Sequence, residues 1–179
     1  MNFVQQEIVR VAQHYLDIKE VGANNSGFND KEFEQRIEAV GWNHGQAWCA
    51  YFAELVWREA YSKFDTTIAN RIGTLFSSGA VSTYQHFEKA DDFTVQQTPI
   101  VGAVVIWQHY KNNKPTWMGH AGIVTSGNSD SIHTIEGNTN KAGDREGQGV
   151  ESKIRSLITV ENPTRLQLLG FIVPKDWIS

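Results

Sequence analysis

Apolar residues near the start of the chain recur at intervals of three and four positions. This spacing predicts an amphipathic helix that stops before Gly22, with an apolar stripe made of Phe3, Val4, Ile8, Val11, Ala12 and Tyr15. Residues 23–29 are rich in Asn, Ser and Gly, which favour turns. We therefore expect the first helix to be followed by a loop.

Two further helices are predicted before residue 61. The first runs from about residue 30 to 40, with Asn29 or Asp30 as its N-cap and Gly41 at its end. Residues 47–60 form the second, because their apolar positions again follow helical spacing: Cys49, Phe52, Ala53, Val56, Trp57 and Ala60. Cys49 is therefore expected in the first turn of a buried helix.

In the second half of the chain, the apolar residues no longer follow helical spacing. Short segments rich in β-branched residues predict strands at residues 101–107, 120–125, 131–136 and 168–173, with a weaker candidate at 152–160. Helices followed by antiparallel strands predict an α+β fold with the helices packed on the sheet. Because 40% of the 179 residues are hydrophobic, the chain has enough apolar side chains to form one sizeable core. We therefore expect a single domain over residues 1–179.

Charge and composition narrow the classes of partner. A net charge of -4, with Lys and Arg spread along the chain, lacks the basic patch of a nucleic-acid-binding protein, so we expect no nucleic acid partner. Residues 1–15 interleave Gln, Glu and Arg with apolar residues, unlike a secretion signal, and no apolar run approaches transmembrane length. We expect synthesis in the cytoplasm without a signal peptide and no membrane association.

Cys49 is the single cysteine, so it forms no intrachain disulfide and cannot belong to a cysteine-rich zinc site. At a helix N-terminus, unpaired N–H groups and the helix dipole favour the thiolate, which is the nucleophilic form of the side chain. A cysteine on an apolar helix face is also often a small buried hydrophobe. The nucleophilic interpretation therefore requires a partner.

The expected partner is a histidine, because imidazole can take the thiol proton and return it near neutral pH. Four of the six histidines are expected in surface positions or polar loops: His14, His44, His86 and His109. The other two, His120 and His133, lie in predicted strands. His120 is expected to begin its strand at a sheet end, where it can reach a cleft, whereas strand alternation turns His133 away. The pattern favours His120.

A third polar group is needed to orient the imidazole. The strand after His120 returns as a hairpin and brings Glu136 close to it. If the extended conformation continues, Glu136 and Asn138 share a face. Either residue is a candidate for the orienting role.

Three segments in this order resemble the CHAP family of cysteine, histidine-dependent amidohydrolases and peptidases: Trp48-Cys49-Ala50-Tyr51-Phe52, Gly119-His120-Ala121-Gly122-Ile123-Val124 and Ile135-Glu136-Gly137-Asn138. With a similar approach segment from Glu20, the resemblance covers residues 20–140. It implies a papain-like, NlpC/P60-related fold in which the helix bearing the nucleophile packs on an antiparallel sheet. It also implies that Cys49 is the nucleophile and His120 the base, with Glu136 and Asn138 completing the catalytic site.

The same resemblance implies cleavage of bacterial peptidoglycan, by an N-acetylmuramoyl-L-alanine amidase or by an endopeptidase of the stem peptide or cross-bridge. Two interpretations are open for Trp48 and Trp117, which flank the catalytic segments: each binds substrate by stacking or packs in the core. The protein would act on the wall after lysis or signal-independent export, as a phage endolysin or as an antibacterial effector with an immunity protein.

Two alternatives remain open at the level of sequence. One is a non-catalytic wall-binding or interaction module with this fold, and the other is a thiol amidase or deamidase that acts on protein side chains. Some relatives bind calcium through an acidic loop, but residues 24–27 here are followed only by Asp30, which is too little carboxylate for such a site. We expect a monomer with no metal and no cofactor.

Overall fold

The computed structural model describes residues 1–139, 148–158 and 165–176. The described residues contain five helices: α1 (Phe3–His14), α2 (Lys31–Ala39), α3 (Cys49–Ser62), α4 (Thr66–Leu75) and α5 (Ala80–Glu88). They also contain six strands: β1 (Thr94–Gln96), β2 (Val104–Lys111), β3 (Lys114–Gly127), β4 (Ser131–Thr139), β5 (Gly149–Ser156) and β6 (Leu166–Val173).

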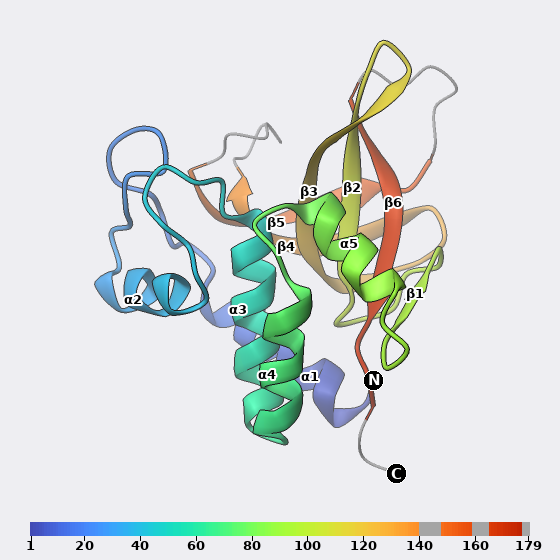
Figure 1. Ribbon diagram of the computed structural model, residues 1–179, viewed down its shortest axis with the longest axis horizontal. Coiled ribbons are helices and arrows are strands. Elements are labelled where there is room, and N and C mark those ends of the chain that lie inside the picture. The colour runs from blue at the N-terminus through green and yellow to red at the C-terminus, as the bar shows by residue number, and fades with distance from the viewer. Residues whose placement is uncertain (140–147, 159–164, 177–179) are drawn as a thin grey trace.

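The strands form one antiparallel sheet in the order β1-β6-β2-β3-β4-β5 (Figure 1). Alternate residues of its central strands pack with the helices in the main core: Val104, Ile106, Ala121, Ile123, Ile135 and Ile172. The expected α+β class is therefore confirmed, and the layers agree with a papain-like fold. None of the described helices combines the length and apolar character that a membrane span needs.

The predicted helices are confirmed, and two of them, α1 and α2, begin at a polar side-chain cap. Asn2 and Gln5 form a reciprocal capping box at the start of α1. Asp30, rather than Asn29, caps α2, because its carboxylate accepts hydrogen bonds from the N–H groups of Glu32 and Phe33. Polar caps of this kind mark helix starts that the sequence itself encodes.

Helix α3 lies at the centre of the helical layer. Every residue from Cys49 to Trp57 is buried, and the helix contacts α1, α2, α4, β3 and β4. The indole of Trp57 donates to the carbonyl of Gly102 at 2.9 Å, which ties the helix to the turn before β2. Packing on all sides fixes the direction of α3 and the position of its first residue.

Three elements between residues 66 and 96 were not predicted: α4, α5 and β1. Helix α4 had a usable signal, since Asp65 caps it and its buried residues follow helical spacing: Ile68, Ala69, Ile72 and Leu75. Helix α5 begins after Gly79 without a side-chain cap, so its start is poorly marked in the sequence. Figure 1 shows α5 lying across β2, β3 and β6.

The predicted strands β2, β4 and β6 are confirmed, but β3 is longer than expected. It begins at Lys114, so the prediction that His120 begins a strand is wrong, and His120 lies near its middle. The reason is a hairpin turn at Asn112 and Asn113, both with positive φ, which lets β2 and β3 pair almost to the turn. Strand β5 matches the weaker candidate at 152–160, whose last two residues lie outside the described residues.

Candidate active site

Cys49 is the first residue of α3 and is 7% exposed. The first α-helical hydrogen bond runs from the N–H of Phe52 to the carbonyl of Trp48, at 2.8 Å. The N–H groups of the preceding turn therefore have no partner within the helix. Burial alone would raise the pKa of the thiol, but His120 and the N–H groups of Ala121 and Ala50 outweigh burial and lower it.

His120 stands on β3 with only 2% of its surface exposed. Its Nε2 lies 2.8 Å from Oε2 of Glu136. Its Nδ1 has no nitrogen or oxygen partner among the described residues, which leaves this atom for the Cys49 thiol. Burial alone would lower the pKa of His120, but contacts with Cys49 and Glu136 raise it to about 9. Both shifts favour a thiolate–imidazolium pair.

Glu136 on β4 is fully buried and its carboxylate is saturated with donors. Oε1 accepts from the Thr134 hydroxyl at 2.6 Å and from Nε of Arg155 at 2.8 Å, while Oε2 accepts from Nη2 of Arg155 as well as contacting His120. Burial would raise the pKa of this carboxyl group, but Arg155 and His120 lower it to about 2. Glu136 is therefore ionised at every pH near neutrality.

Gly122 makes room for this carboxylate. A Cβ at position 122 would lie 2.7 Å from Cγ of Glu136, too close for any residue larger than glycine without a shift. Gly137 plays the same part on the helix side, since a Cβ there would lie 2.5 Å from the Trp48 ring and 2.7 Å from Phe52. These two glycines let β3, β4 and α3 approach closely enough for Cys49, His120 and Glu136 to meet.

The histidine ring is held from a second side by Trp107. Trp107 on β2 pairs directly with His120 across the strands, and the two rings stack with centroids 5.9 Å apart. The guanidinium of Arg155 lies over the Trp107 ring, with its Cζ 5.3 Å from the ring centroid, as in a cation–π contact. Sequence reasoning missed Trp107, Thr134 and Arg155, because nothing in their local patterns distinguishes them from other strand residues.

Glu136 and Asn138 do not occupy equivalent positions. Asn138 has φ of +54°, and the pairing of β4 with β5 shifts register between Glu136 and Thr139. The extended conformation that would have kept both side chains on one face therefore stops at Gly137. Glu136 contacts the imidazole, whereas Asn138, which is 1% exposed, lines the pocket beside Cys49.

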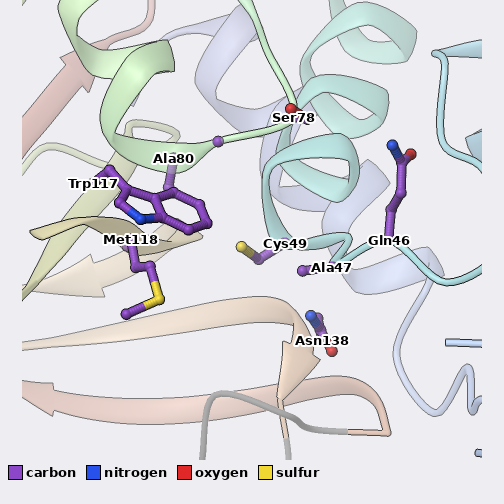
Figure 2. Close-up of a pocket in the computed structure, with 10 residues that line it drawn as sticks. Gln46, Ala47, Cys49, Ser78, Ala80, Trp117, Met118 and Asn138 are labelled. Atoms are coloured by element: carbon purple, nitrogen blue, oxygen red, sulfur yellow. The ribbon is translucent and has the colours of Figure 1, made fainter. Parts of the chain in front are cut away.

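A pocket of about 230 Å³ opens over Cys49, between the start of α3, the start of α5 and strand β3. Figure 2 shows the thiol between Asn138 on one side and Trp117 and Met118 on the other. The described residues that line the pocket are uncharged except for the thiol: Gln46, Ala47, Cys49, Ser78, Gly79, Ala80, Trp117, Met118, Gly119 and Asn138. The first residue of the unpredicted helix α5, Ala80, and the two residues before it therefore supply one wall of the pocket.

The two tryptophans expected to bind substrate have different positions. Trp117 is 79% exposed and lines the pocket. Trp48 is fully buried, and its ring packs edge-on against Phe28 while its Nε1 donates to Glu20. The expected substrate contact of Trp48 is therefore corrected: as the residue before α3, it points into the aromatic core, away from the pocket.

The other histidines lie outside this arrangement. None of the five is among the described residues that line the pocket, and four are exposed: His14, His44, His86 and His133. His44 lies with Glu34 and Glu38 in a group whose potential metal-ligating atoms are within 4.8 Å of one another. Glu34 already accepts from the N–H of Phe28 and from Lys31, so internal hydrogen bonds and ion pairs account for the position of its carboxylate.

Comparison with known proteins gives one match. The family model described as the CHAP domain matches residues 41–138, a segment that contains Cys49, His120, Glu136 and Asn138. No curated protein and no solved structure matches the chain.

Proposed function

Because the chain belongs to the CHAP family, whose model matches more than half of its length, we propose that it hydrolyses an amide bond of peptidoglycan by thiol catalysis. CHAP domains are typically amidases or peptidases, and membership supports that general activity. The observation that carries the proposal is the buried Cys49–His120–Glu136 arrangement at the pocket.

In this mechanism, the Cys49 thiolate attacks the carbonyl carbon of the amide. The N–H groups of the first turn of α3 stabilise the oxyanion, and one such donor typically contributes about 3 kcal/mol. Figure 2 shows the amide nitrogen of Asn138 on the side that faces Cys49, so that Asn138 can supply a further donor. These groups are ordered before substrate arrives, which limits the cost of reorganisation during the reaction.

His120 moves the protons. As the imidazolium, it gives its Nδ1 proton to the departing amine, and a thioester with Cys49 remains. The neutral ring then takes a proton from water, which attacks the thioester carbonyl and releases the carboxylic acid and the thiolate. Glu136 holds Nε2 throughout and stabilises the charged ring.

Within peptidoglycan, we place the scissile bond between the sugar and the first alanine. The described residues that line the pocket are uncharged and offer no partner for the carboxylates and ammonium groups of a peptide stem. The exposed Trp117 ring at the rim offers a flat apolar face on which a sugar ring can stack. Both features favour an N-acetylmuramoyl-L-alanine amidase over an endopeptidase.

The test is mass spectrometry of purified peptidoglycan after digestion by the full chain. An amidase releases intact stem peptides with a free N-terminal alanine and leaves glycan strands without peptide. Unchanged polymer under conditions where Cys49 is reduced and alkylatable would overturn the hydrolase proposal. Peptides cut internally would retain the thiol mechanism but exclude the sugar-to-alanine bond.

Replacement of Trp117 by alanine is expected to weaken substrate binding without unfolding the protein. An aromatic stacking contact is worth about 0.5–1.5 kcal/mol, so KM should rise by roughly 2- to 10-fold while kcat changes little. Because Trp117 is exposed, the free energy of unfolding should change by less than about 0.5 kcal/mol.

Phe3→Ala provides the matched control for Trp117→Ala. Phe3 is an aromatic residue that is 68% exposed on α1 and does not line the pocket. Its loss should leave KM for soluble wall fragments unchanged. Equal KM values for Trp117→Ala and the wild type would remove Trp117 from the binding site.

A further inference from the structure

Arg155 is tied to the catalytic histidine by two separate routes. Through its Nε and Nη2 atoms it donates to both oxygens of Glu136, which in turn contacts Nε2 of His120. Its guanidinium also lies over the ring of Trp107, which stacks on the imidazole ring itself. The guanidinium thus supports the two groups that fix the position of His120.

Arg155 reaches this arrangement from a strand outside the segment that the family model matches. Arg155 belongs to β5, directly opposite Ile132, and its guanidinium reaches Glu136, which lies four residues further along β4. Its side chain is 22% exposed, whereas the Glu136 carboxylate is completely buried. Arg155 also lies beyond residues 41–138, the segment that the family model matches. It is a feature of this chain that family membership alone does not assign.

We propose that Arg155 is a positioning residue that keeps Glu136 ionised and aligned, so that His120 can hold its Nδ1 toward Cys49. This inference rests on the proposed thiol mechanism and names a further residue for it. Arg155 touches neither substrate nor thiol; it acts through Glu136.

The physical reason lies in the direction of one hydrogen bond. An ionised Glu136 only accepts, so Nε2 of His120 carries a proton and Nδ1 is the atom that exchanges a proton with the thiol. A protonated Glu136 can instead donate to Nε2, which shifts the neutral ring to the tautomer with its proton on Nδ1. That tautomer cannot take a proton from Cys49. A carboxylate as buried as Glu136 needs a fixed cation to avoid protonation.

Among the described residues, the charged side chains that act on this carboxylate are Arg155 and His120. Cys49, on α3, contacts His120. On the same face of β5 lie Glu151, opposite Glu136, and Lys153, opposite Thr134. The pKa of Glu136 is lowered chiefly by Arg155 and then by His120, against the effect of burial. Arg155 is therefore the cation whose removal should change the site.

The experiment measures the rate at which iodoacetamide alkylates Cys49 between pH 4 and pH 10, in the full chain without substrate. In Arg155→Gln, the pH below which Cys49 is protonated and alkylation slows should be higher than in the wild type. Alkylation at pH 5 should be at least ~10-fold slower. Arg155→Lys keeps the charge but loses the two-point contact, so its alkylation profile should lie between those of the wild type and Arg155→Gln. With wall substrate, kcat should fall while KM stays constant.

A double-variant cycle separates positioning from a merely structural role. If Arg155 acts through Glu136, then Arg155→Gln added to Glu136→Gln should change the alkylation profile by less than about 2-fold. The double variant leaves neither charge buried without its partner, so the comparison survives even if Arg155→Gln alone folds poorly. Additive effects in the cycle, or a wild-type profile in Arg155→Gln, would overturn the proposal.

Arg71→Gln is the matched control, because Arg71 also holds a carboxylate with two donors, each 3.0 Å from Asp92, but on the surface of α4. It should leave the alkylation profile unchanged. Failure of the thiol mechanism itself would look different. In that case the wild-type thiol would show an ordinary pKa that does not respond to His120→Ala.

Discussion

Cys49→Ala is expected to abolish hydrolysis of peptidoglycan while leaving the protein folded. Removal of the nucleophile from a thiol or serine hydrolase typically costs on the order of 10⁴- to 10⁶-fold in kcat, because no covalent intermediate can form. The pocket and the contact between His120 and Glu136 do not depend on the sulfur atom. The measurement is release of soluble fragments from purified walls by equal amounts of wild type and variant.

Two controls make the Cys49→Ala result interpretable. The replacement removes a single buried atom, so the free energy of unfolding in urea should change by about 1 kcal/mol or less. Cys49→Ser retains a polar atom of similar size and should be as inactive as the alanine variant, since an alcohol in this position has no comparable tendency to ionise. Substantial wall hydrolysis by purified Cys49→Ala would exclude Cys49 as the nucleophile.

His120→Ala is expected to remove both activity and the reactivity of the Cys49 thiol. Without the imidazole, burial raises the pKa of Cys49 and only backbone N–H groups oppose it. Alkylation at pH 7 should therefore slow by at least ~10-fold. In the wild type, kcat/KM should decline as the pH rises through about 9, where His120 loses its proton. The readouts are the pH profiles of alkylation and of kcat/KM.

The free energy of unfolding should also depend on pH differently in the wild type and in His120→Ala. The folded pKa of His120, about 9, lies above its usual value of 6.5. Its charge therefore contributes stability that is fully present below about pH 6.5 and is lost as the pH rises through about 9. The wild type should lose stability across this window, and His120→Ala should lose much less.

His133→Ala is the matched control for His120→Ala. His133 is an exposed histidine on the neighbouring strand β4, and its side chain makes no contact with Cys49 or Glu136 among the described interactions. Its replacement should leave both pH profiles unchanged. A thiol whose reactivity is the same with and without His120 would argue against the catalytic pair.

Several parts of the site were predictable because they depend on local spacing. Helical periodicity placed Cys49 in the first turn of a buried helix, where the structure finds it. Strand alternation favoured His120 over His133, and the structure buries the first and exposes the second. The hairpin brought Glu136 near His120. Backbone geometry over a few residues determines each of these features, so a single sequence carries the information.

Other parts depended on contacts that local spacing does not encode. Trp48 adjoins Cys49 in sequence, yet the two side chains leave the start of α3 in different directions, one into the aromatic core and one toward the pocket. A backbone bulge at Gly137 and Asn138 separated two residues that simple alternation would have kept together. Small changes in backbone direction at such points decide which side chains meet.

The sequence by itself determined the fold class, the candidate nucleophile and its candidate histidine partner, because each follows from periodicity and from the chemistry of single residue types. Only the tertiary structure decided how that histidine is held. Arg155 reaches Glu136 across 19 residues of sequence, and Trp107 reaches His120 from a different strand. These contacts arise from strand register and from side chains that extend along the sheet, and both are fixed only when the whole sheet has formed.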